Sequence, residues 1–447
     1  MKGDFTRNTF DPTKQFTRVL MQQGRVQLDA DWNEQGAILL HYLQALAADL
    51  IGPHGGPDGG FNISRIDDHG GTLVDLGIGN GRYYVNGALC ENLSAKATYY
   101  NQAQYPLLPR TDPLPAAPFL VYLDVWERLI TAVEDDHIRE VALGGVDTAA
   151  RAQSVWQVKT SNKTADGQDI PAALPGDFAD WPAWADSQWA AWLEQWQPEN
   201  RGQLKARAKA PDARPDDACI TPPDARYRGA ENQLYRVEIH DGRFDGFGNR
   251  QIPTFKWSRD NGSVVFPLRR LSGKVAIVED LGRDGRFTLE PGHWVEVVDD
   301  GYTLRGASHP LLKVQTVDRD TMTVILSGDS NVLVNGSGAG HPYLRRWDGY
   351  TKIQEGAGSD NWLSLEDGVQ IQFQAAPNDG SHTYRGGDYW LIPARAATGD
   401  VEWPKERDGL GELAATAVPP NGVWHRYAPL ALVTAVDPIA DLRRLLK

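Results

Sequence analysis

The chain has 447 residues, enough for two to four domains or for fewer large β domains. Its formal net charge of −14 would repel a nucleic-acid backbone unless a local basic patch outweighed it, and no sufficiently dense run of Lys and Arg occurs. The 45 Gly, 28 Pro and 15 Trp indicate a turn-rich β architecture with aromatic cores.

The cysteines and the start of the chain bear on the compartment. Only Cys90 and Cys219 occur, with no CxxC pair, which fits a reducing environment. The opening "MKGDFTRNTF" lacks the apolar core of a signal peptide, and no run approaches the roughly 20 apolar residues that cross a bilayer. We therefore expect a protein made and folded in the cytoplasm, without direct membrane insertion.

Residues 1–60 are expected to form an extended arm followed by an amphipathic helix. The arm covers residues 1–28 and turns at Gly24, and Asp29 or Asp31 can cap the helix that ends at Gly52–Pro53. Apolar residues at three- and four-residue spacing give the helix one broad apolar face: Ile38, Leu39, Tyr42, Leu43, Leu46 and Leu50. This face either docks on a neighbouring subunit or packs on the chain's own first β domain.

Short strands dominate residues 61–160 and 226–447. "FLVYLDVWERLI" is apolar on nearly both faces, so we predict a central buried strand. "LYRVEIH" alternates apolar and polar residues, which predicts a half-buried strand, and Asn261–Gly262 between two apolar runs predicts a hairpin. The last 23 residues read as one strand and a short terminal helix or tail. The spacing suggests barrels or sandwiches rather than βαβ units.

Residues 161–225 interrupt the β pattern with a tryptophan-rich helix and a linker. Five indoles fall within one stripe about 140° wide on that helix. They are Trp181, Trp184, Trp189, Trp192 and Trp196. The stripe either packs on the host domain, docks a partner subunit, or serves as a carbohydrate platform.

No motif in the chain carries a recognisable catalytic pattern. "GIGNGR" reads as a turn rather than a phosphate loop, and neither GxxxxGK[ST] nor GxSxG occurs. The acids around His137 read as a solvated face, and "DGRFDGFGN" as a glycine turn rather than a calcium loop. Glu231, Glu238 or Asp260 would serve a glycosidase only as a pair about 5 to 10 Å apart in a cleft. We therefore predict no catalytic residue, no cofactor and no metal ligand.

Several segments together resemble an uncharacterised bacterial family whose members accompany phage-tail-like contractile injection systems. They are "MKGDFTRNTFDPTKQFTRVLMQQGRVQLDADWNEQ", "EVALGGVDTAARAQSVWQVK", "YRGAENQLYRVEIH", "FKWSRDNGSVVF" and "GDYWLIPAR…HRYAPLALV". This resemblance spans nearly the whole chain. The first fifty residues are also similar to the start of phage baseplate and tail-fibre proteins. The resemblance implies association with such particles and supplies no catalytic residue.

The expected fold is mainly β (α+β), with barrel- or sandwich-like modules, an N-terminal helix and the tryptophan-rich helical insertion. The predicted segments are 1–60, 61–160, 161–225, 226–340 and 341–447. The expected function is a non-enzymatic structural component of a contractile injection system, at the baseplate periphery or at a fibre attachment. Its partners would be baseplate, fibre or sheath proteins and further copies of the chain, for example in a trimer. The alternatives are a glycan-binding module and a carbohydrate-active hydrolase. The expected docking residues are Phe5, Phe10, Phe16, Trp32, Leu39 and Leu43.

Overall fold

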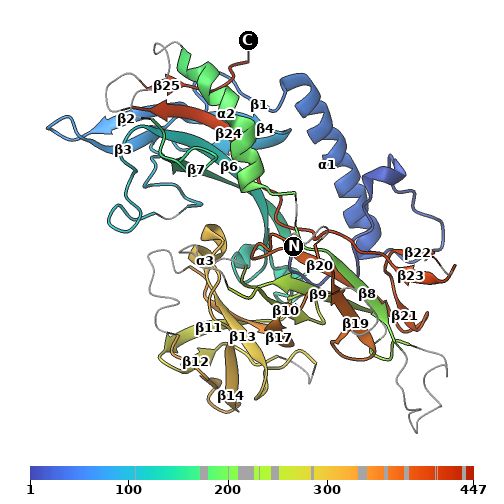
Figure 1. Ribbon diagram of the computed structural model, residues 1–447. Coiled ribbons are helices and arrows are strands. Elements are labelled where there is room, and N and C mark those ends of the chain that lie inside the picture. The colour runs from blue at the N-terminus through green and yellow to red at the C-terminus, as the bar shows by residue number, and fades with distance from the viewer. Residues whose placement is uncertain are drawn as a thin grey trace, which may run out of the picture. The chain divides into compact units, whose positions relative to one another are not determined.

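The chain is mainly β, as its sequence predicts, and divides into two compact units (Figure 1). A computed structural model describes residues 1–105, 107–171, 180–199, 201–209, 226–230, 232–242, 251–282, 286–330, 340–356, 361–376, 382–407, 409, 411–434 and 439–446. The barrel unit comprises residues 1–9, 26–31 and 200–423. The Trp-helix unit comprises residues 10–25, 32–199 and 424–447.

The Trp-helix unit contains a four-stranded antiparallel sheet with the longest strand of the unit in its middle. In order, its strands are β25 (Ala440–Asp441), β24 (Arg426–Val433), β6 (Phe119–Ile130) and β7 (Arg151–Ser161). The predicted central buried strand is confirmed, because β6 lies between β24 and β7 and is buried along most of its length. The described residues after β25 contain no helix.

Two smaller sheets complete the β structure of this unit. They contain β1 (His54–Gly55), β4 (Gly81–Val85) and β5 (Ala88–Asn92), and β2 (Ile63–Asp67) with β3 (Leu73–Ile78). The segment "GIGNGR" contains the end of β3, the start of β4 and the two residues that connect them, so it lies at a strand-to-strand connection. The side chains of Phe61, Leu76 and Tyr83 share a core with Val121 and Leu430 of the larger sheet.

Both predicted helices are confirmed. α1 spans Asp29–Ile51 and α2 spans Trp181–Trp196. α2 packs on the larger sheet, where Trp192 is fully buried and its indole nitrogen donates to the Lys163 carbonyl at 2.9 Å. Short 3-10 turns also occur, among them η1 (Pro12–Lys14), η2 (Asp136–Ile138) and η3 (Val141–Leu143). Among the described residues, no helix combines the length and apolar character needed to cross a membrane.

The barrel unit is built on a closed six-stranded barrel. In order around the barrel, its strands are β11 (Val265–Ser272), β12 (Val275–Val278), β15 (Thr323–Leu326), β14 (Leu312–Asp318), β13 (Trp294–Val298) and β16 (Tyr343–Trp347). Phe266, Val297 and Leu344 belong to its apolar core. A short helix, α3 (Asp300–Arg305), follows β13 directly.

A second, five-stranded sheet of the barrel unit draws strands from both of the predicted modules 226–340 and 341–447. Its order is β17 (Gly349–Lys352), β10 (Thr254–Ser258), β9 (Asn232–Ile239), β20 (Tyr389–Arg395) and β21 (Asp400–Val401). Two smaller sheets contain β18 (Leu363–Ser364), β19 (Val369–Phe373) and β8 (Leu204–Ala208), and β22 (Lys405–Arg407) with β23 (Leu413–Ala415). The two units therefore differ from the predicted five-part division, since strand pairing crosses its boundaries.

The predicted hairpin at Asn261–Gly262 is wrong. Both residues have the positive φ that a hairpin turn needs, 52° and 65°. However, β10 pairs with β9 and β17, whereas β11 pairs with β12 and β16. The turn therefore carries the chain from the five-stranded sheet into the barrel, and local turn chemistry could not distinguish these two outcomes.

Candidate docking site

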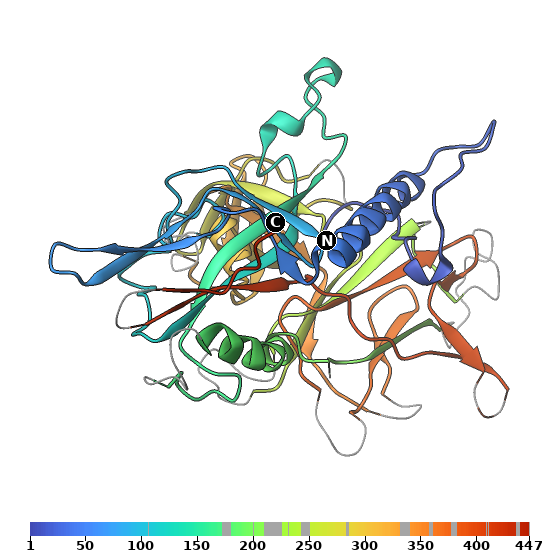
Figure 2. The ribbon, with the colours of Figure 1, turned by 90° about the horizontal axis from the view of Figure 1, so that it is seen from above.

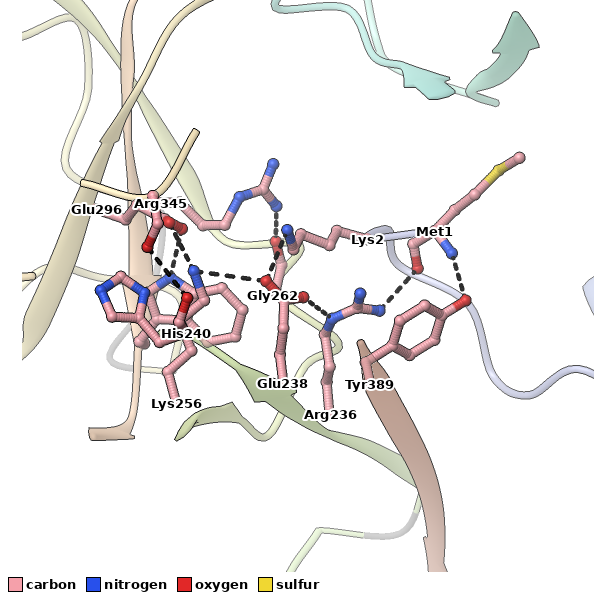
Figure 3. Close-up of polar contacts among 12 residues, drawn as sticks. Met1, Lys2, Arg236, Glu238, His240, Lys256, Gly262, Glu296, Arg345 and Tyr389 are labelled. Carbon is pink, nitrogen blue, oxygen red and sulfur yellow. Dashed lines mark hydrogen bonds and ion pairs between the residues drawn. The ribbon is translucent and has the colours of Figure 1, made fainter. Parts of the chain in front are cut away.

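The first residues of the chain are held inside the barrel unit. The side-chain amide of Asn261 donates to the carbonyl oxygens of Met1, at 3.2 Å, and Gly3, at 2.9 Å. The guanidinium of Arg236 also donates to the Met1 carbonyl, at 3.3 Å (Figure 3). The turn that the sequence suggested as a hairpin thus supplies the side chain that fixes the N-terminal segment.

Lys2 joins this segment to a buried ionic cluster on β9, β10 and β13. Its ammonium lies 2.9 Å from Glu238, which is also bound by Arg236 at 2.6 Å. Lys256 lies 2.5 Å from Glu296 and 3.4 Å from Glu238, so it bridges the two carboxylates. Figure 3 shows Lys2 and Lys256 pointing at Glu238 from two directions.

The prediction that β9 is half-buried is wrong, because both faces of the strand are buried. Tyr235, Val237 and Ile239 lie in the apolar core, as the alternation indicates. Arg236 and Glu238 on the other face are also buried, because they meet Lys2, Lys256 and the N-terminal segment instead of water. Those partners are distant in sequence, so alternation alone cannot reveal them.

The cluster holds both glutamates in their ionised form. Burial alone would raise the pKa of Glu238, but Lys2, Arg236 and Lys256 outweigh burial and hold that pKa well below its ordinary range. Glu296 has a lowered pKa for the same reason, with Lys256 as its strongest cation. Its other oxygen accepts from the Trp347 indole at 3.0 Å.

This arrangement suits anchoring rather than proton transfer. A general acid needs a carboxyl whose pKa lies near the working pH, and neither glutamate is in that state. Asp260 has a different partner, Arg286, at 2.6 Å, and Glu231 lies outside the described residues. The ionic cluster and Asn261 together hold residues 1–3 in place on the barrel unit.

A second contact closes the base of the arm. The backbone nitrogen of Thr6 donates to one carboxylate oxygen of Asp29 at 3.0 Å, and the Thr6 hydroxyl donates to the other at 2.6 Å. Asp29 is the first residue of α1, so the contact also places a carboxylate at the positive end of that helix. Residues 7–28 therefore form a loop with both ends fixed, which we call the arm loop.

The arm loop carries exposed apolar side chains. It turns back at Gly24, where the Arg25 nitrogen donates to the Gln22 carbonyl at 3.3 Å, as the predicted turn requires. Figure 2 shows it as a narrow dark-blue loop extending past α1. Its contacts with α1 include a hydrogen bond from the Val19 nitrogen to Gln35 at 2.8 Å. Its exposed apolar residues are Phe16, Leu20, Met21, Val26 and Leu28.

One face of α1 is also apolar and exposed. Trp32 is 81% exposed, Leu43 65% and Leu50 76%, whereas Ile38 is buried. The helix therefore packs on its own chain through Ile38, and the leucines expected to do so under the alternative interpretation are left uncovered. We define the docking surface as Phe16, Leu20 and Met21 of the arm loop together with five residues of α1, all within the Trp-helix unit: Trp32, Leu39, Leu43, Leu46 and Leu50.

The structure separates the six predicted docking residues into two groups. Phe16, Trp32, Leu39 and Leu43 are exposed members of the docking surface. Phe5 and Phe10 are only half-exposed, and the Phe10 ring lies 5.6 Å from the His41 ring of α1. Leu46 and Leu50 were not among the predicted docking residues, although they continue the same spacing along the helix.

The tryptophan stripe faces the chain's own sheet. Trp192 is buried, and the Trp196 ring stacks on Tyr122 of β6 with centroids 4.3 Å apart. The other three indoles, Trp181, Trp184 and Trp189, are partly buried against the same apolar cluster. This leaves the stripe with little free ring surface for a partner or a glycan.

The remaining candidate motifs lie at the surface or largely outside the described residues. His137 lies in the exposed turn η2, and most of "DGRFDGFGN" lies outside the described residues. In the part of the chain that the structure describes, His, Cys, Asp and Glu form no group of three or more that could hold a metal ion.

Comparison with known families matches residues 1–180 and 188–438 to a family of unknown function. The chain therefore belongs to the family of unknown function DUF6519. Searches of curated proteins and of solved structures gave no match to it.

Proposed function

We propose that this protein is a non-enzymatic assembly component of a phage-tail-like contractile particle, at the periphery of the baseplate or at a fibre attachment. The observation that carries the proposal is the docking surface, which leaves large apolar side chains exposed on both the arm loop and α1. Contiguous exposed apolar surface on a folded chain marks an interaction site.

The energetics favour a protein partner for this surface. Burying an exposed leucine or valine fully stabilises a complex by up to about 2 kcal/mol. The arm loop and α1 offer several such residues close together in sequence, and their ordering cost is reduced because both ends of the loop are already fixed. A surface of this kind binds another folded polypeptide rather than a small polar ligand.

The sequence resemblance supports the kind of assembly. The segments that resemble the injection-system family run through both units, and the likeness to phage baseplate and fibre proteins covers the arm loop and α1. In this proposal the chain folds in a bacterial cytoplasm and becomes part of an intracellular or released particle. Its partners are baseplate, fibre or sheath proteins, and it requires no cofactor.

The test is incorporation of arm-loop variants into native particles. In a strain carrying the Leu20→Asp, Met21→Asp double variant, we expect purified particles to lack the protein, as measured by mass spectrometry. Leu93→Asp is the matched control, because Leu93 is 87% exposed and lies on neither the arm loop nor α1. We expect this control to be incorporated at the wild-type level.

Two outcomes of this experiment would contradict the proposal. Wild-type amounts of the arm-loop variant in the particles would exclude the arm loop as the attachment, and absence of the wild-type protein from all particles would exclude the assembly role. Deleting the whole N-terminal segment would be a poorer experiment, because it removes Lys2 from Glu238 as well.

A further inference from the structure

The exposed residues of α1 follow a heptad repeat. Successive members are four, three, four, three and four residues apart, which is the a/d spacing of helices that pack side by side in a coiled coil. We call this set the α1 seam: Trp32, Gly36, Leu39, Leu43, Leu46 and Leu50. All six are exposed, and a Cβ at Gly36 would meet no atom within 4 Å.

We infer that the α1 seam packs against the same seam of further copies of this chain, in a parallel helical bundle. This inference rests on the proposed function, since it names one partner of the docking surface. Under it, the seam holds copies of the chain together, and the arm loop remains available to attach the oligomer to other particle proteins.

The residues that flank the α1 seam are compatible with packing against a second copy of the same helix. With Leu39 and Leu46 at d, the flanking g positions are Gln35, Tyr42 and Asp49, and the e positions are Asn33, Leu40 and Ala47. Parallel copies would place Tyr42 beside Ala47, and would place Leu40 beside Gln35, which already accepts from Val19 of its own arm loop, so no two like charges meet. A charged partner helix would find few complementary groups here, because Asp49 is the single charged residue among these six positions.

The size of the seam favours a bundle of more than two helices. From Trp32 to Leu50 the seam is about 27 Å long, and a helix is about 10 Å wide, so one flank offers roughly 270 Å². A stable two-body interface buries about 800 Å² per partner. In a cyclic bundle each helix contacts two neighbours, which raises the buried area to roughly 540 Å² per helix, and the exposed Leu40 and Tyr42 beside the seam add to this area.

The first experiment measures the mass of the purified full-length chain by sedimentation velocity over a concentration series. We expect the wild type to form an oligomer of at least three copies at tens of micromolar, and the Leu43→Glu, Leu46→Glu double variant to be monomeric. Leu93→Glu is the control and should match the wild type. Circular dichroism should be unchanged in the variants, because these side chains are exposed.

A wild type that is monomeric at all concentrations up to about 100 µM would overturn the inference, as would a seam variant with the wild-type mass. Either result leaves the proposed function standing if the protein still enters particles and the arm-loop variant does not. Conversely, an oligomer that depends on the seam but is never found in particles would support the inference and refute the proposed function.

A second experiment tests the parallel orientation. In a Cys219→Ser background, Leu43→Cys should form a disulfide between copies under mild oxidation, because a parallel register places equivalent positions in one layer. Cys90 is buried and does not interfere. If crosslinks form only when Leu39→Cys and Leu43→Cys chains are mixed, the helices are antiparallel and the parallel bundle is excluded.

Discussion

At the scale of single residues, Glu238 links the N-terminal segment to the core of the barrel unit. Its buried carboxylate forms ion pairs with Lys2, Arg236 and Lys256. Removing one member of a buried ionic group leaves the others uncompensated, which costs more than the pair contributes when intact. The cluster therefore makes the position of residues 1–3 sensitive to any change at Glu238.

We predict an acid sensitivity that depends on this residue. The pKa of Glu238 is lower in the folded chain than its ordinary value of 4.5, so its contribution to stability is present above pH 4.5 and is lost as pH falls below it. Chemical unfolding of the wild type at a series of pH values should show this loss. Glu238→Gln should show a smaller pH dependence between pH 4.5 and 3.

At neutral pH the Glu238→Gln variant should also be less stable than the wild type by about 3 to 5 kcal/mol, because two lysines and an arginine lose a buried counter-charge. Glu402→Gln is the matched control. Glu402 pairs with Arg7 at 3.3 Å but is 39% exposed, so we expect a change below about 1 kcal/mol. Equal effects of the two substitutions would refute the anchoring role of Glu238.

At the scale of elements, the periodicity of apolar residues is sufficient to predict those helices and strands whose own apolar residues form their packing face. α1, α2 and β6 follow from apolar spacing, caps and length. The polar face of β9 and the role of Asn261 could not be predicted, since their partners, Lys2 and Gly3, lie more than 230 residues away. The exposure of the apolar face of α1 could not be predicted either, because the same residue spacing occurs in helices that pack on their own chain and in helices that bind another protein.

The contact between Thr6 and Asp29 gives a prediction for the arm loop. Asp29→Ala removes both acceptors of Thr6, so the base of the loop should open while the two units stay folded. Limited proteolysis should then cut within residues 7–28 at least several-fold faster than in the wild type. Asp49→Ala, at the other end of α1, is the control and should be cut at the wild-type rate.

If Asp29→Ala and the wild type are cut at the same rate, the contact does not hold the base of the loop closed. In that case Phe10 against His41 and Val19 against Gln35 would be the contacts that position the arm loop. Substitution of Gln35 by Ala would then be expected to increase cutting instead.

At the scale of the whole molecule, neither unit is a continuous stretch of sequence. The Trp-helix unit takes its strand β24 from the C-terminal part of the chain, and that strand lies between β6 and β25. The predicted segments end at compositional breaks, and such breaks cannot reveal a strand that returns to a sheet after more than 200 intervening residues.

A chain ending at Val423 should therefore lose the Trp-helix unit. It lacks Leu432 of β24, Ala440 of β25 and the following Leu442, which share an apolar cluster with Trp192, so Trp192 should become solvated. We expect a red-shifted tryptophan emission and loss of one cooperative unfolding transition. Emission and unfolding like those of the wild type would show that β6 and β7 are stable without their C-terminal neighbour.

The fixed base of the arm loop also limits how far the protein can search for a neighbour. A free tail of 22 residues could sample distances up to about 70 Å, whereas the same residues pinned at both ends could extend at most half as far, about 35 Å, and the bond from Val19 to Gln35 holds the loop closer still. The arm loop therefore reaches only a short distance from the surface of the protein. Under the proposed function, a neighbouring protein must therefore already lie close by before the arm loop can bind it, so attachment would occur late in assembly.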